Sequence, residues 1–73
     1  MKLSDFLSNG LEKFSRGQCD SISILDAEGE TLQVVAMDKF DTIKPEYLSA
    51  DFAAVGSSTL KPTRLRIRIN YMN

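Results

Sequence analysis

Hydrophobic and polar residues alternate without a break near the end of the chain, in the stretch TRLRIRIN at residues 63–70. In an extended chain successive side chains point to opposite sides. One side here carries Leu65, Ile67, Ile69 and Tyr71, and the other carries Arg64, Arg66, Arg68 and Asn70. This period of two predicts a half-buried β-strand over residues 63–71, with the aliphatic side toward the core.

Residues 3–16 follow a different period, which is typical of one helical face. The apolar positions are Leu3, Phe6, Leu7, Leu11 and Phe14. They predict a helix that ends near Arg16, because Gly17 follows as a terminator. Gly10 lies in the same apolar stripe, although glycine costs about 1 kcal/mol relative to alanine inside a helix. We therefore expect either close approach of another backbone at Gly10 or a break in the helix there.

Residues 20–38 predict a β-hairpin with a three-residue loop at positions 27–29. This loop gives Gly29 the position that requires a positive φ. The opposed apolar residues would then be Ile24 with Leu32 and Ile22 with Val34. A two-residue loop would instead set Ile24 against Gln33, so the pattern favours the longer loop.

Residues 39–62 fit two interpretations. In the first, which we favour, Pro45 opens a helix that carries Leu48, Phe52 and Val55 on one side and ends at Gly56. In the second, a short turn at 44–48 precedes a strand from about Asp51 to Ser57, which pairs with the last strand. The alanines at 53 and 54 suit both.

The predicted order of elements is α, β, β, then α or β, then β, which indicates an α+β fold. We expect a small two-layer domain with the N-terminal helix packed on a mainly antiparallel sheet of three or four strands. A chain of 73 residues is short enough to be a single domain, residues 1–73. Its hydrophobic fraction of 42% is that of a globular protein, so disorder is not expected.

Several kinds of chemistry lack the residues that they require. The chain has no histidine and one cysteine, Cys19, so Ser-His and Cys-His pairs, structural zinc sites and iron–sulfur clusters are excluded. The acids of DAEGE (Asp26, Glu28 and Glu30) resemble part of a calcium loop but lack its distal glutamate, and we interpret them as a hairpin turn. We expect no cofactor and no enzyme; an enzyme would need a carboxylate pair facing a cleft.

The expected location is the reducing cytoplasm. A lone cysteine cannot form an internal disulfide. The stretch MKLSDFLSNG lacks the apolar run of a signal peptide, and no stretch is long and apolar enough to span a membrane.

Charge is distributed unevenly along the chain, although the total is −1. Residues 1–60 carry five bases against ten acids, whereas residues 61–73 carry four bases and no acid. The candidate partner-binding residues in this basic end are Lys61, Arg64, Arg66, Arg68 and Asn70. Alternatively, the arginines only protect an outer strand from pairing with other sheets, or acids on a neighbouring strand neutralise them.

We hypothesise a non-enzymatic protein–protein interaction module that binds an acidic partner through the arginine-bearing strand. Its size suits a small stoichiometric inhibitor or accessory factor of the kind that viral and mobile-element genomes encode. The alternative is nucleic-acid binding by the same strand, because alternate arginines about 7 Å apart match the phosphate spacing. No aromatic residues interleave the arginines, which favours the protein partner. Homodimerisation is a further expectation for so small a core.

Overall fold

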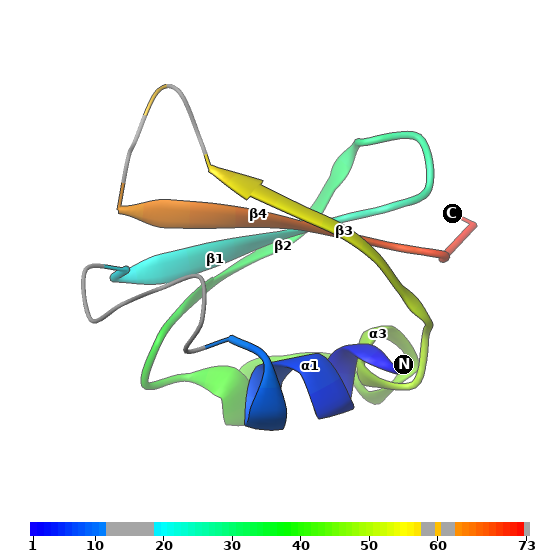
Figure 1. Ribbon diagram of the computed structural model, residues 1–73, viewed down its shortest axis with the longest axis horizontal. Helices are drawn as coiled ribbons and strands as arrows, with labels where there is room; N and C mark the ends of the chain where they lie inside the picture. The colour runs from blue at the N-terminus through cyan, green and yellow to red at the C-terminus, as the bar shows by residue number, and fades with distance from the viewer. Residues whose placement is uncertain (12–18, 58–59, 61–62, 73) are drawn as a thin grey trace.

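The computed structural model describes residues 1–11, 19–57, 60 and 63–72 (Figure 1). The helices are α1 (Leu3–Asn9), the 3-10 helix η1 (Phe40–Thr42) and α3 (Pro45–Leu48). The strands are β1 (Ser21–Leu25), β2 (Thr31–Ala36), β3 (Phe52–Ser57) and β4 (Arg64–Ile69). Within these described ranges, no helix has the length and apolar character needed to cross a membrane.

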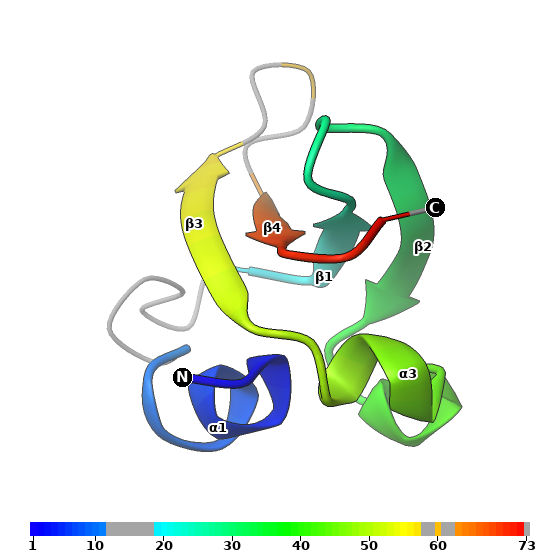
Figure 2. The ribbon, with the colours of Figure 1, turned by 90° about the vertical axis from the view of Figure 1, so that its right-hand side faces the viewer.

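The strands form one mixed sheet in the order β2-β1-β4-β3. The two outer pairs, β1 with β2 and β3 with β4, are antiparallel, whereas the central pair of β1 and β4 is parallel. Both α1 and α3 lie on the same side of this sheet, as Figures 1 and 2 show. The α+β fold class, with helices layered on a mainly antiparallel sheet, is confirmed.

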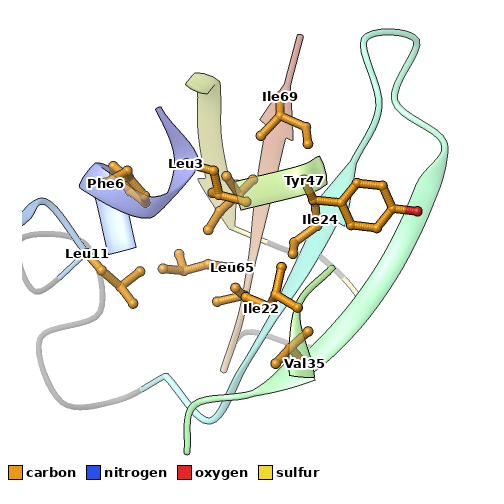
Figure 3. Close-up of a cluster of buried hydrophobic side chains, with 11 residues drawn as sticks. Leu3, Phe6, Leu11, Ile22, Ile24, Val35, Tyr47, Leu65 and Ile69 are labelled. Atoms are coloured by element: carbon orange, nitrogen blue, oxygen red, sulfur yellow. The ribbon is translucent and has the colours of Figure 1, made fainter. Parts of the chain in front are cut away.

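The core lies between the sheet and this helical layer (Figure 3). Its fully buried side chains come from α1, β1 and β4, and they are Leu3, Ile22, Ile24, Ile67 and Ile69. Phe6 of α1 stacks on Phe52 of β3 with ring centroids 4.3 Å apart. The alternation in the last strand is also confirmed, because Leu65, Ile67 and Ile69 are buried while Arg66 and Arg68 are exposed.

The first helix is shorter than its apolar stripe predicts. α1 ends at Asn9, with Gly10 as its C-cap, so the predicted break in the helix at Gly10 is correct. Just past this end, the Leu11 N–H donates to the Phe6 carbonyl. Among the described residues, no other segment of backbone approaches Gly10 as expected. A Cβ there would instead lie 2.9 Å from the Phe6 ring. The remainder of the predicted helix, residues 12–16, lies outside the described residues.

The hairpin has the predicted three-residue loop, with Gly29 at φ 89°, but not the predicted strand register. Ile22 lies opposite Val35 and Ile24 opposite Gln33. Leu32 is an extra residue in β2, because Leu25 pairs with Thr31 while Ile24 pairs with Gln33. This bulge moves Val35 to the core and leaves Val34 47% exposed. The predicted pairs of Ile24 with Leu32 and Ile22 with Val34 are therefore wrong.

The favoured long helix from Pro45 to Gly56 is also wrong, and the second interpretation is correct. α3 ends at Leu48, and residues from Phe52 onward form β3, which pairs with β4. The reason is tertiary: as a strand, Phe52 reaches the ring of Phe6, and Val55 lies opposite the buried Ile67.

Replacing Ile67 tests whether β4 supplies the centre of the core. Ile67→Ala removes a side chain with no exposed area, so we expect a loss of about 2–5 kcal/mol in the free energy of unfolding, and about 1 kcal/mol for Ile67→Val. Val34→Ala on the other side of the sheet is the control and should cost much less. Urea denaturation measures all three, and equal losses for Ile67→Ala and Val34→Ala would contradict this packing.

Candidate binding surface

The side of the sheet away from α1 and α3 is here called the open face. Because Ile22, Ile24, Leu65 and Ile67 point to the core, their strand neighbours point to the open face. Its residues are Ser21, Ser23 and Leu25 of β1, Arg64, Arg66 and Arg68 of β4, Ala54 and Gly56 of β3, and Val34 and Ala36 of β2. The arginine column therefore runs down the middle of the sheet, between two columns of mostly small residues.

Arg64 is held within the protein. Its Nε–H donates to Ser21 Oγ at 2.9 Å, and Ser21 Oγ donates in turn to Asp20 Oδ1 at 2.8 Å. Thr63 donates to the other Asp20 oxygen at 2.9 Å. The parallel register places Ser21 directly beside Arg64, which makes this chain of hydrogen bonds possible.

Arg66 and Arg68 differ from Arg64. Both are exposed, and neither forms a side-chain hydrogen bond or an ion pair with any residue in the described part of the chain. The neighbouring strands SISIL and FAAVGS contain no acid that could neutralise them. Protection of an outer strand does not explain them either, because β4 is an interior strand. Both structural explanations considered from the sequence therefore fail for these two residues.

A shallow depression of about 280 Å³ lies beside the two arginines. Its lining comes from all the strands but β2, together with the hairpin turn: Leu25, Gly29, Ala54, Val55, Gly56, Ser57, Arg66 and Arg68. Gly56 lies opposite Arg66 and Ala54 opposite Arg68. These are the smallest side chains available, so the space next to each guanidinium group stays open. Two charged forks thus border a hollow with an uncharged floor.

The other two candidate residues lie apart from this hollow. Asn70 is exposed at the end of β4, and its backbone N–H donates to the Asp51 carbonyl. Lys61 falls outside the described residues. Sequence reasoning missed Ala54 and Gly56, because it took Gly56 as a terminator. The signal that could have found them is the pairing of β3 with β4, which the sequence pattern left undecided.

The first acid of the hairpin turn, Asp26, stabilises the turn itself. Asp26 is 4% exposed, and its Oδ1 accepts the backbone N–H groups of Glu28 and Glu30, each at 2.9 Å. This carboxylate replaces the main-chain partners that the turn leaves unpaired. Among the described residues, no group of three or more acids or cysteines lies close enough together to hold a metal ion.

A second hollow, of about 310 Å³, lies on the helical side between α1, η1 and α3. It is lined by Ser4, Leu7, Ser8, Phe40, Asp41 and Leu48. Among the described residues that line it, Asp41 alone is charged. The depression beside Arg66 and Arg68 is smaller, but it has the groups that would orient a charged ligand.

Tyr71 ties the C-terminal residues to α3. Its hydroxyl donates to Glu46 Oε2 at 3.1 Å, and its ring meets Tyr47 edge-on with centroids 5.0 Å apart. The hydrogen bond to Glu46, and then the loss of water around the phenol, raise the pKa of Tyr71 above its ordinary value of 10.0. This bond stabilises the fold at neutral pH, and the contribution is lost as the pH rises through the native pKa.

Comparison of the chain with family models, with curated proteins and with solved structures finds no match. The case for a function therefore depends on the geometry of the open face.

Glu46→Gln tests the link between the C-terminal residues and α3. A neutral amide stabilises the protonated phenol less than a carboxylate does, so the pKa of Tyr71 should fall toward 10. The measurement is an NMR titration of the Tyr71 ring carbons in both proteins. The same Tyr71 pKa in wild type and variant would show that the hydrogen bond does not exist in solution.

Proposed function

We propose that this chain is a non-enzymatic binding module that captures an acidic segment of a partner protein with Arg66 and Arg68. The observation that carries the proposal is the pair of exposed guanidinium groups on an interior strand, which lack any partner among the described residues. The helices of the described residues lie on the other side of the sheet, so these groups face outward.

The chemistry of arginine suits this role. Its planar guanidinium binds a carboxylate through two parallel hydrogen bonds, and its long stem packs against apolar surface. Alternate residues of a strand are about 7 Å apart on one face. Carboxylates on alternate residues of an extended partner have the same spacing, so two such pairs can form together.

Burial of the pairs would supply the affinity. An exposed pair contributes only about 0.2–1 kcal/mol, whereas a charged group in the dry centre of an interface costs about 2–5 kcal/mol when it is truncated. The uncharged floor formed by Ala54 and Gly56 allows a partner to exclude water around the arginines.

As part of this proposal, the protein meets its partner in the reducing cytoplasm. It acts there as an inhibitor or accessory factor, by covering a surface of that partner.

Nucleic-acid binding has less support, because the open face as described carries no aromatic side chain on which bases could stack. Arg64 already donates a hydrogen bond to Ser21, so we assign it a role in stabilising the open face and no direct contact with the partner.

The double variant Arg66→Ser/Arg68→Ser should lose partner capture while keeping its fold. Affinity capture from host extract with mass spectrometry, followed by binding measurements on the purified partner, provides the test. We expect at least a tenfold loss of affinity, or about 1.4 kcal/mol. A partner that binds the variant as well as it binds wild type would contradict the proposal.

Two further variants sharpen this test. Lys39→Ser/Lys44→Ser removes the same charge from the helical side and should leave binding nearly unchanged. Arg66→Lys/Arg68→Lys keeps the charge but not the planar fork, so it should bind with intermediate affinity. Capture of DNA or RNA, with an affinity that falls steeply as salt rises, would reassign the face to phosphate binding.

A further inference from the structure

The outer edge of β3 begins covered and then becomes free. Phe52 N–H donates to the Met1 carbonyl at 2.7 Å, and Lys2 forms a β-bridge with Asp51. Beyond this point, residues 53–57 accept no hydrogen bond from described residues outside the β3–β4 ladder. The order β2-β1-β4-β3 places no other described strand beside them. With respect to the described residues, a five-residue strand edge is therefore available.

This edge lacks the usual protection against pairing with another strand. Natural proteins protect edges with charged side chains, proline or bulges. Residues 53–57 read AAVGS and contain no charge and no proline. A bulge at Ala53 disturbs only the start of the segment. The edge is thus suited to accept a further strand.

Nothing in the described part of the structure explains Gly56. Its φ is not positive, and a Cβ built on it would meet no atom within 4 Å. Glycine inside a strand weakens the strand and often marks close approach of a ligand or another backbone. On the open face, Gly56 separates the free edge from Arg66, and Ala54 separates it from Arg68.

The spacing of strands connects the edge to the arginines. A strand added to β3 would lie about 5 Å from β3 and about 10 Å from β4. Glutamate and arginine side chains extended toward one another cover this distance. They can meet only because the intervening residues on β3 have almost no side chain. A larger residue at position 56 would stand between them.

We propose that the partner's acidic segment adds to residues 53–57 as a fifth strand and reaches over Gly56 and Ala54 to pair with Arg66 and Arg68. This inference rests on the proposed function and specifies how the partner is held. Main-chain hydrogen bonds to the edge would supply affinity, and the side chains at alternate positions would supply specificity. The other side of the added strand would pack beside Val55, so its residues should be apolar.

The predicted ligand is therefore an extended segment in which acidic and apolar residues alternate. The probe is a capped eight-residue peptide that alternates glutamate with valine. A peptide with the same composition but with its glutamates and valines in two blocks is the first control. An alternating peptide methylated on every second backbone nitrogen, which cannot pair with an edge, is the second.

Binding is measured by titration of the full chain, and amide hydrogen exchange is measured by NMR. The alternating peptide should slow exchange at residues 53–57 and should bind at least about tenfold more tightly than either control. Gly56→Val should weaken binding by a similar factor, because its side chain obstructs the path to Arg66. Ala36→Val enlarges an exposed side chain on β2, at the far edge of the sheet, and should not. If Gly56→Val fails to fold, Gly56→Ala replaces it in the test, because the added Cβ would meet no described atom within 4 Å.

The outcomes separate this inference from the proposed function. In one outcome, binding requires Arg66 and Arg68 but is unaffected by the substitutions at Gly56, and amide exchange at residues 53–57 is unchanged. This outcome would overturn strand addition and leave the proposed function intact. Absence of peptide binding at low salt would also overturn strand addition. The proposed function would still be tested separately, by partner capture with wild type and with Arg66→Ser/Arg68→Ser. Self-association that protects residues 53–57 without peptide would assign the edge to a second copy and overturn the proposed occupant.

Discussion

The parallel pairing of β1 with β4 is the constraint on which the structure depends. It sets Ile22 beside Leu65 and Ile24 beside Ile67 in the middle of the core. Because side chains alternate between the two faces of a sheet, this pairing also places the arginines together on the other face. A shift of one residue in the register would bring guanidinium groups into the core, at a cost that so small a domain could not offset.

The helical layer follows from the same pairing. α1, η1 and α3 together cover one face of the sheet, and the stacked rings of Phe6 and Phe52 join this layer to β3. The chain has no further helix in its described part for the opposite face. Small residues and one tied arginine, Arg64, make that face stable in water, while Arg66 and Arg68 stay available to a partner. The core and the candidate binding surface are thus the two faces of one sheet.

The sequence predicted the features that depend on local pattern. The alternation in β4, the start of α1 and the positive φ of Gly29 each follow from a few adjacent residues. The register of the hairpin could not be predicted in this way. The bulge at Leu32 shifts the strand pairing by one residue, and the order of apolar and polar residues does not indicate it. The strand at Phe52 also needed tertiary information, since its partners Phe6 and Ile69 lie far away in sequence.

The candidate site was predictable to the same extent. The arginine row was visible, but its neighbours Ala54 and Gly56 could be found only from the β3–β4 register. The most direct test of the account is an NMR measurement of proton contacts across β1 and β4. We predict contacts between the side chains of Ile24 and Ile67, and contacts of Arg66 with its cross-strand neighbours Ser23 and Gly56. Contacts that place Arg66 on the same face as Ile24, or against a carboxylate of the chain itself, would contradict it.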